Sequence, residues 1–152
     1  MKKYILLCIC AVAALTGCVG PRYTGSSIEN IETVDVVILH DASTRAGFQE
    51  AMESWLKGHG YQYTVAPAGS KYDLDKINLE YFGKWQWDLA IYLSEASVTA
   101  YTKGQKVGHV QFRAPNSLSP NKFGNAEERI RYIMDVLFKK LTIDEANKLI
   151  NQ

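Results

Sequence analysis

The chain has 152 residues, of which 47% are hydrophobic and 22% are charged, and its formal net charge is +1. This length is sufficient for one domain with a hydrophobic core. Because the charge is nearly balanced, the chain lacks the basic footprint of nucleic-acid-binding proteins, and we expect no nucleic-acid partner.

Residues 1–17 have the pattern of an export signal. Lys2 and Lys3 precede an uncharged, largely apolar run from Tyr4 to Leu15, which is too short and wrongly flanked for a stable transmembrane span. The motif LTGC, which ends at Cys18, resembles the lipobox of bacterial lipoproteins. In those proteins a diacylglyceryl group is joined to the cysteine thiol before cleavage, and an acyl chain is usually added to the new amine.

The lipobox resemblance implies a mature protein from Cys18 to Gln152 that lipid holds to a membrane. Each buried methylene contributes about 0.8 kcal/mol and one chain binds only marginally, so two or three chains form a lasting anchor. Val19 follows the cysteine, which in lipoproteins of Gram-negative bacteria points to the outer membrane, and we expect the domain to face the periplasm. The alternative is an ordinary secretory signal with Cys18 as a chance residue near the cleavage site.

Removal of the leader simplifies the cysteine and charge counts. Cys8 and Cys10 leave with it, so the mature domain has no free thiol, no intramolecular disulfide and no cysteine-based metal site. Loss of Lys2 and Lys3 takes the 17 basic residues to 15, against 16 acidic ones.

Residues 18–32 are predicted to be the lipidated cysteine and a flexible tether, because the stretch VGPRYTGSSIENIE is rich in glycine and serine and has little apolar periodicity. Residues 33–152 are predicted to form a single domain. No internal repeat or second linker divides them.

The domain opens with a strand, a helix and a second strand. Residues 34–39 form a β-branched apolar run typical of a buried strand. Capping residues at 41–44 lead into a helix with an apolar face, and Gly58 and Gly60 end it. That face consists of Phe48, Met52, Trp55 and Leu56. Residues 61–66 alternate and predict the second strand.

The middle of the chain has the sequence patterns of strands, and its C-terminal part has those of helices. Four further strands are predicted at residues 77–81, 85–93, 97–102 and 106–113, with a tight turn at Lys103-Gly104. Asn125 and Thr142 each cap a helix, with a glutamate three residues later. We therefore expect an α+β, two-layer fold: a mixed, mainly antiparallel sheet of about five strands, two long helices on one face and a short C-terminal helix.

The segment YFGKWQWD, Tyr81 to Asp88, is the densest aromatic stretch. Side chains two apart in a strand share a face, so Trp85 and Trp87 are predicted to lie with the odd-numbered apolar residues beneath the helices. Tyr92 falls on the opposite, wetter face. The apolar positions change to even numbers after Leu93, which predicts a bulge near Ser94 and Glu95.

Candidates for chemistry are sparse. His40, Asp41, Ser43 and Arg45 lie where the first strand meets the helix, a place where ligands gather in sheets with parallel strands, although helix capping also explains these residue types. His40, His59 and His109 lack the close spacing of a metal motif, so we expect no metal and no cofactor. Asp73 and Asp75 share a loop and are interpreted as solvated charges.

A family resemblance covers most of the mature chain. The pattern W-x-W-D-x-A-x-Y-L from Trp85 to Leu93, with the lipobox, a K-G-Q-K-V-G turn and Lys122-Phe123, resembles a family of small, uncharacterised lipoproteins of Gram-negative bacteria. More loosely, the layout is similar to envelope lipoproteins whose small α/β domains act as accessory or assembly factors. The resemblance implies no catalytic residue.

Three functions remain open from the sequence. The leading hypothesis is a non-enzymatic accessory lipoprotein that docks onto an envelope protein. The second is a ligand-binding module whose exposed tyrosines stack on a sugar such as cell-wall glycan, through Tyr61, Tyr63, Tyr92 and Tyr101. The third and weakest is a hydrolase-like enzyme that uses His40, Asp41 and Ser43.

Overall fold

The structure is a computed structural model that describes residues 20–31, 35–115 and 119–150. The strands are β1 (Tyr23–Ser26), β2 (Asp35–Leu39), β3 (Gln62–Ala66), β4 (Ile77–Asp88), β5 (Ala90–Thr102) and β6 (Gln105–Arg113). The helices are α2 (Ala46–Gly58), α3 (Ala126–Leu137) and α4 (Ile143–Leu149), with a 3-10 turn η1 (Pro120–Phe123).

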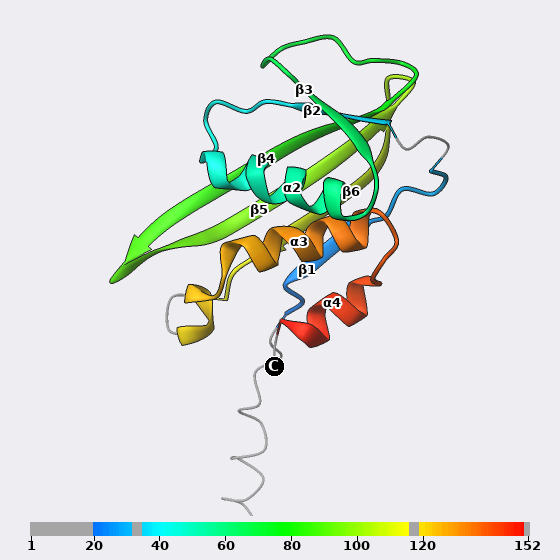
Figure 1. Ribbon diagram of the computed structural model, residues 1–152. Coiled ribbons are helices and arrows are strands. Elements are labelled where there is room, and N and C mark those ends of the chain that lie inside the picture. Colours follow the sequence, from blue (N-terminus) through cyan, green and yellow to red (C-terminus); the bar gives the residue numbers. More distant parts are fainter. Residues whose placement is uncertain (1–19, 32–34, 116–118, 151–152) are drawn as a thin grey trace, which may run out of the picture.

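The strands form one sheet in the order β1-β6-β5-β4-β2-β3. β2 is parallel to β3 and β4, and the other pairs are antiparallel. α2 and α3 lie on the same face of this sheet, with α4 beside β1 (Figure 1). The predicted α+β architecture is confirmed, with six strands instead of about five. No helix of the described residues is long and apolar enough to cross a membrane.

The long helices form as their apolar periodicity predicts. In α2 the residues Phe48, Met52, Trp55 and Leu56 are all buried against the sheet and α3. Thr142 and Glu145 form the expected capping box of α4. Asn125 caps α3 by accepting a hydrogen bond from the backbone N–H of Glu127.

β1 corrects the predicted tether. Tyr23–Ser26 lie within residues 18–32 but pair with β6, and the ring of Tyr23 is fully buried, 5.1 Å from that of Phe112. Gly25 permits this pairing, because a Cβ at that position would lie 1.9 Å from the carbonyl oxygen of His109. The glycine therefore serves close strand packing, and β1 begins five residues after Cys18 in the sequence.

The β4–β5 hairpin corrects the predicted strand at residues 85–93. β4 continues without interruption from Ile77 to Asp88, and the chain then reverses at Leu89, whose φ is 62°. No glycine or asparagine marks this turn, so the sequence pattern did not reveal it. The predicted bulge is confirmed, because Lys84 pairs with Glu95 and Trp85 with Leu93, which leaves Ser94 without a partner in β4.

Candidate functional site: an apolar hairpin tip

The two most exposed large apolar side chains of the described residues, Leu89 and Trp87, lie at the end of the β4–β5 hairpin beside a third exposed one, Ile91. Trp87, Leu89 and Ile91 are 73%, 86% and 52% exposed. Trp87 and Ile91 are cross-strand partners, and Leu89 is the turn between them. These three residues are called the apolar tip below. Exposed apolar groups that gather in this way commonly mark a surface that binds another molecule.

The prediction that both tryptophans lie beneath the helices is wrong for Trp87. Trp85 is half-buried and packs against the core, at the base of a shallow groove whose sides are the first turns of α2 and α3. The hairpin projects past these helix ends, as Figure 1 shows at its lower left. Trp87 thus points to the side of the sheet that carries the helices, but beyond the reach of any helix.

A short chain of hydrogen bonds holds the hairpin at the point where it extends beyond the body of the protein. The backbone N–H of Gly83 donates to the hydroxyl of Thr44 over 3.1 Å, and that hydroxyl donates to Oδ2 of Asp41 over 2.7 Å. The other carboxylate oxygen of Asp41 accepts from the hydroxyl and the N–H of Ser43. The hydrogen bonds from Ser43 and Thr44 hold the pKa of the Asp41 carboxyl below its usual range.

Arg129, on α3, ties the opposite side of the hairpin to η1. Its guanidinium is buried and donates to the carbonyl of Leu93 over 3.0 Å, and to those of Lys122 and Asn121 over 2.9 and 2.6 Å. It also lies 4.8 Å from the ring centre of Phe112. Burial lowers the pKa of this guanidinium. Sequence reasoning missed Arg129, although its place beside the apolar face of α3 was a visible signal.

Lys122 completes the support of the tip. Its buried ammonium group forms an ion pair with Asp88, and lies 4.9 Å from the ring centre of Phe123. Phe123 in turn packs edge-on against Tyr92, with ring centres 5.6 Å apart. Asp88 is the one ionisable carboxylate or ammonium in the run from Trp85 to Ser94. The projecting segment therefore carries a single charge, and that charge is paired.

The four tyrosines predicted as a ligand surface lie in separate places. Tyr61 packs against Trp55 and Phe138, and Tyr63 donates a hydrogen bond to Glu53, both on the helix side. Tyr92 is buried and donates to Gln86. Tyr101 stacks on Tyr72, with ring centres 4.8 Å apart. These rings do not form the contiguous, exposed surface that stacking on a glycan requires.

The residues predicted for the enzyme alternative are also engaged separately. Nδ1 of His40 lies 2.8 Å from Oε1 of Gln49, and Ser43 donates to Asp41 instead of to His40. The guanidinium of Arg45 lies 5.3 Å from the centre of the Trp85 ring. A serine activated by histidine requires a hydrogen bond between them, and none joins these two side chains.

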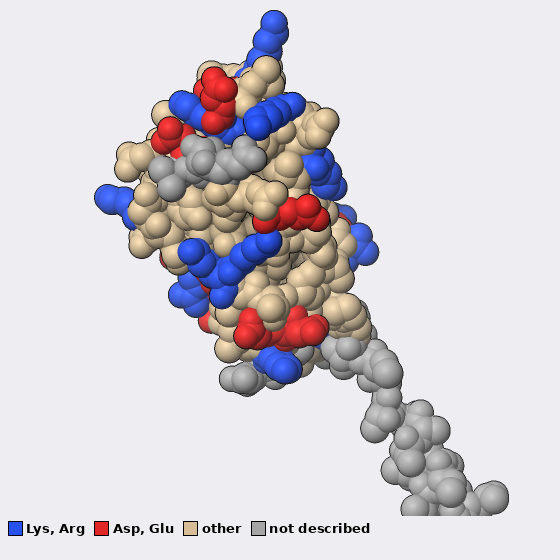
Figure 2. All heavy atoms as spheres, turned by 90° about the vertical axis from the view of Figure 1, so that its right-hand side faces the viewer, with Lys and Arg blue, Asp and Glu red and all other residues tan. Residues whose placement is uncertain are grey.

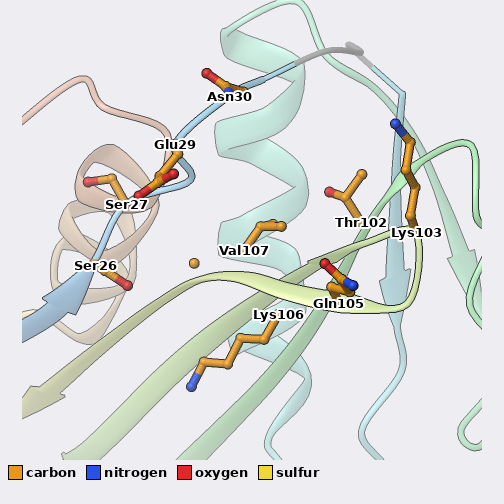
Figure 3. A pocket seen from close by; sticks show the side chains of 10 residues that line it. Ser26, Ser27, Glu29, Asn30, Thr102, Lys103, Gln105, Lys106 and Val107 are labelled. Carbon is orange, nitrogen blue, oxygen red and sulfur yellow. The ribbon is translucent and has the colours of Figure 1, made fainter.

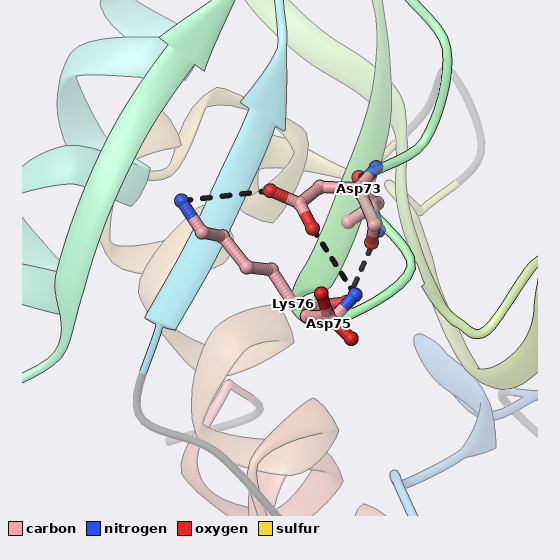
Figure 4. Close-up of polar contacts among 4 residues, drawn as sticks. Asp73, Asp75 and Lys76 are labelled. Atoms are coloured by element: carbon pink, nitrogen blue, oxygen red, sulfur yellow. Dashed lines mark hydrogen bonds and ion pairs between the residues drawn. The ribbon is translucent and has the colours of Figure 1, made fainter.

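The remaining polar candidates have local partners. Asp73 accepts from the backbone N–H of Asp75 and pairs with Lys76 at 3.6 Å, so it shapes the loop before β4 (Figure 4). His59 stacks on Trp55, and His109 lies 2.9 Å from the hydroxyl of Thr99. In the part of the chain that the structure describes, no group of three or more His, Cys, Asp or Glu residues could hold a metal ion.

A hollow lies at the end of the sheet away from the tip. Polar and charged side chains of the 26–30 segment and the β5–β6 turn line it, among them Glu29, Gln105 and Lys106 (Figure 3). It is shallow, and its side chains do not converge on one point. On the face in Figure 2, acidic and basic side chains are interspersed.

The chain was compared with family models, curated proteins and solved structures. No family model matches it, and no curated protein matches it. A crystal structure of a minor lipoprotein from Acinetobacter baumannii is similar, with a TM-score of 0.33 and 16% identity over 81% of this chain and 89% of that one. A TM-score this low establishes neither a shared fold nor a shared function. Cys18 lies outside the described residues.

Proposed function

We propose that this protein is an outer-membrane lipoprotein, anchored by lipid on Cys18 and facing the periplasm, that acts without catalysis by binding another envelope protein. The observation that carries the proposal is an asymmetry between the two edges of the sheet. One edge is closed by the protein's own side chains, and the other is open.

The closed edge is β1. Oδ1 of Asn147, on α4, accepts hydrogen bonds from the N–H groups of Arg22 and Tyr23 over 2.7 and 2.8 Å. Nδ2 of the same side chain donates to the carbonyl of Tyr23 over 3.0 Å. The amide thus occupies the outward backbone groups at the start of β1, which hinders the pairing of another chain there.

The open edge is β3. It pairs with β2 on one side, and no other strand of the described residues lies on its outer side. Val65 is 42% exposed on this strand, between polar and small neighbours. An edge strand with free backbone groups accepts an extended segment of a partner, whose main chain supplies affinity and whose side chains supply selectivity.

The absence of a catalytic arrangement among the described residues supports a binding role. The carboxylate of Asp41 is occupied by Ser43 and Thr44, and His40 contacts Gln49. These contacts organise the start of α2 and leave no free nucleophile and base pair at this end of β2.

Crosslinking in living cells tests the partner. A photoreactive amino acid at Val65 is expected to capture one envelope protein, whereas the same group at exposed Lys148, which follows Asn147 on α4, is expected not to. Val65→Lys should abolish the interaction without unfolding the domain, since a lysine at an exposed edge discourages strand pairing. Capture of nothing at Val65, of the same proteins at both positions, or of a second copy of this chain would contradict the proposal.

Membrane fractionation tests the anchor separately. We expect Cys18→Ser to release the processed domain from the membrane fraction, because the acyl chains are lost. A Cys18→Ser protein that is cleaved and stays membrane-bound would refute the lipid anchor.

A further inference from the structure

We propose that the apolar tip enters the same membrane leaflet that holds the lipid of Cys18, and so forms a second contact of the domain with lipid. This inference rests on the lipid anchor of the proposed function. Three observations support it: the direction of the tether, the length of chain available to it, and the composition of the tip.

The strand pairing places the tether and the tip at the same end of the sheet. Tyr23 pairs with Phe112, Phe112 with Ala96, and Ala96 with Gly83, so these four residues form one row across the sheet. β1 is antiparallel to β6, which is antiparallel to β5. The start of β1 therefore points the same way as the start of β5, which is the hairpin turn (Figure 1).

The distance that covalent geometry allows between Cys18 and that row is similar to the distance between the row and the hairpin turn. Leu89 is six residues beyond Gly83, which at about 3.3 Å per residue carries the turn roughly 20 Å outward. Cys18 is five residues before Tyr23, so covalent geometry allows it at most about 18 Å from that residue. A bilayer that holds the lipid of Cys18 at the tether's end of the sheet therefore lies within reach of the tip.

The composition of the tip suits the boundary between headgroups and acyl chains. Tryptophan has an apolar body with one polar group and concentrates at membrane interfaces, and Trp87 is flanked here by Leu89 and Ile91. The nearby Asp88 is neutralised by Lys122, so no unpaired charge enters with them. Phe123, 39% exposed on η1, adjoins Tyr92 at the base of the hairpin.

This orientation is compatible with a protein partner at β3. One strand, β2, separates the hairpin strand β4 from β3 in the sheet. Contact of the tip with lipid would therefore leave the outer side of β3 uncovered, and the two contacts can exist together.

Fluorescence of the lipidated full chain tests the inference. The protein is expressed with its own leader, purified, and reconstituted into vesicles of phosphatidylethanolamine and phosphatidylglycerol with brominated acyl chains. Ile91→Cys, labelled with an environment-sensitive fluorophore, is compared with Leu74→Cys, which is 58% exposed and lies near the β5–β6 turn at the other end of the sheet. We expect bluer emission and several-fold stronger quenching at position 91.

Intrinsic fluorescence provides a second measurement that needs no label. Brominated chains should quench the wild-type protein more than Trp87→Phe, because Trp55 is buried and Trp85 is shielded by the helix ends. All three variants are first compared with the wild type by circular dichroism, and Trp87→Tyr replaces Trp87→Phe if the phenylalanine variant has lost its fold.

The outcomes separate this inference from the proposed function. Mass spectrometry of the purified chain reports the lipid on Cys18, and its absence would overturn both. Lipid on Cys18 with equal quenching at positions 91 and 74 would overturn the insertion of the tip alone. Shielding of position 91 in native envelopes but not in protein-free vesicles would assign the tip to a protein partner, and would overturn the inference as well.

Discussion

The two halves of the β4–β5 hairpin have the same alternation of apolar residues and opposite surroundings. In the half nearer the body, Ile77 and Leu79 lie beneath the helices and are buried. In the far half, Trp87 continues the same row on the same face and is 73% exposed. The alternation of apolar residues along a strand therefore specifies which face of the sheet a side chain occupies. Whether that side chain is buried depends on whether a helix covers that part of the face.

The largest expected contrast is between a buried and an exposed position of this row. Leu79→Ala should lower the free energy of unfolding by about 2–5 kcal/mol, because it leaves a cavity in the core. Trp87→Ala should change it by less than about 1 kcal/mol, since the side chain is mostly in water. Urea denaturation of both variants measures the difference. Equal losses would mean that the tip is packed in solution.

Arg129 tests whether the far half depends on its buried support. Arg129→Met should lower the free energy of unfolding by about 2–3 kcal/mol, because three backbone carbonyls lose a charged donor while the apolar stem is retained. Hydrogen exchange should rise first in residues 85–93. Arg129→Lys serves as the control that keeps the charge, and full stability in the methionine variant would contradict the role of this side chain.

Gly83 marks the boundary between the two halves. A Cβ there would lie 2.8 Å from Cδ2 of Phe48 and 3.1 Å from Cγ2 of Thr44. Gly83→Ala should therefore cost about 1–3 kcal/mol through overpacking. Gly83→Ala combined with Phe48→Leu should recover part of the loss in thermal unfolding. No recovery would indicate that the backbone hydrogen bond to Thr44, and not the contact with Phe48, limits this position.

Leu89 should respond in the opposite direction. Leucine at a φ of 62° is strained, whereas glycine adopts this conformation freely. Leu89→Gly should therefore raise the free energy of unfolding by up to about 1 kcal/mol while removing exposed apolar surface. Ala90→Gly, within the strand, is the matched control and should be destabilising. A loss of stability in Leu89→Gly would indicate that the leucine side chain makes a packing contact in solution.

The smallest effect concerns pH and Asp41. Its folded-state pKa is lowered, so its contribution to stability is present above the usual pKa of 3.8 and is lost as pH falls through the folded-state value. The wild type should lose stability below pH 3.8 more steeply than Asp41→Asn. The urea midpoints of both proteins at neutral and acidic pH measure this loss of stability. An identical change of the midpoint with pH in both proteins would mean that the hydrogen bonds from Ser43 and Thr44 do not stabilise the charged form of Asp41.

Much of the fold could be predicted because its signals are local. Alternation identified β3 and β6, helical periodicity identified the buried face of α2, and the Thr142–Glu145 pair identified the start of α4. Each of these depends on residues within a few positions of one another. The bulge opposite Lys84 was also visible, because the apolar positions change parity on either side of it.

The candidate site was predicted only in part. The sequence located the aromatic segment and the correct face for Trp85 and Trp87, but it did not indicate the turn at Leu89, since leucine is rare at positive φ. The join of β1 to the sheet was hidden in a stretch with the composition of a linker, where Tyr23 alone supplies a large buried ring.

By itself, the sequence determined the helices and most strands, the face on which the side chains of a strand alternate and the caps that begin α3 and α4, since all three follow from neighbours along the chain. Only the tertiary structure decided that Trp87 is exposed, that Arg129 supports the hairpin and that Tyr23–Ser26 form a strand of the sheet. Those outcomes depend on where residues far apart in sequence meet, as Arg129 meets Leu93 and Tyr23 meets Phe112. Whether a side chain is buried or exposed therefore depends on contacts between residues that are far apart in the sequence.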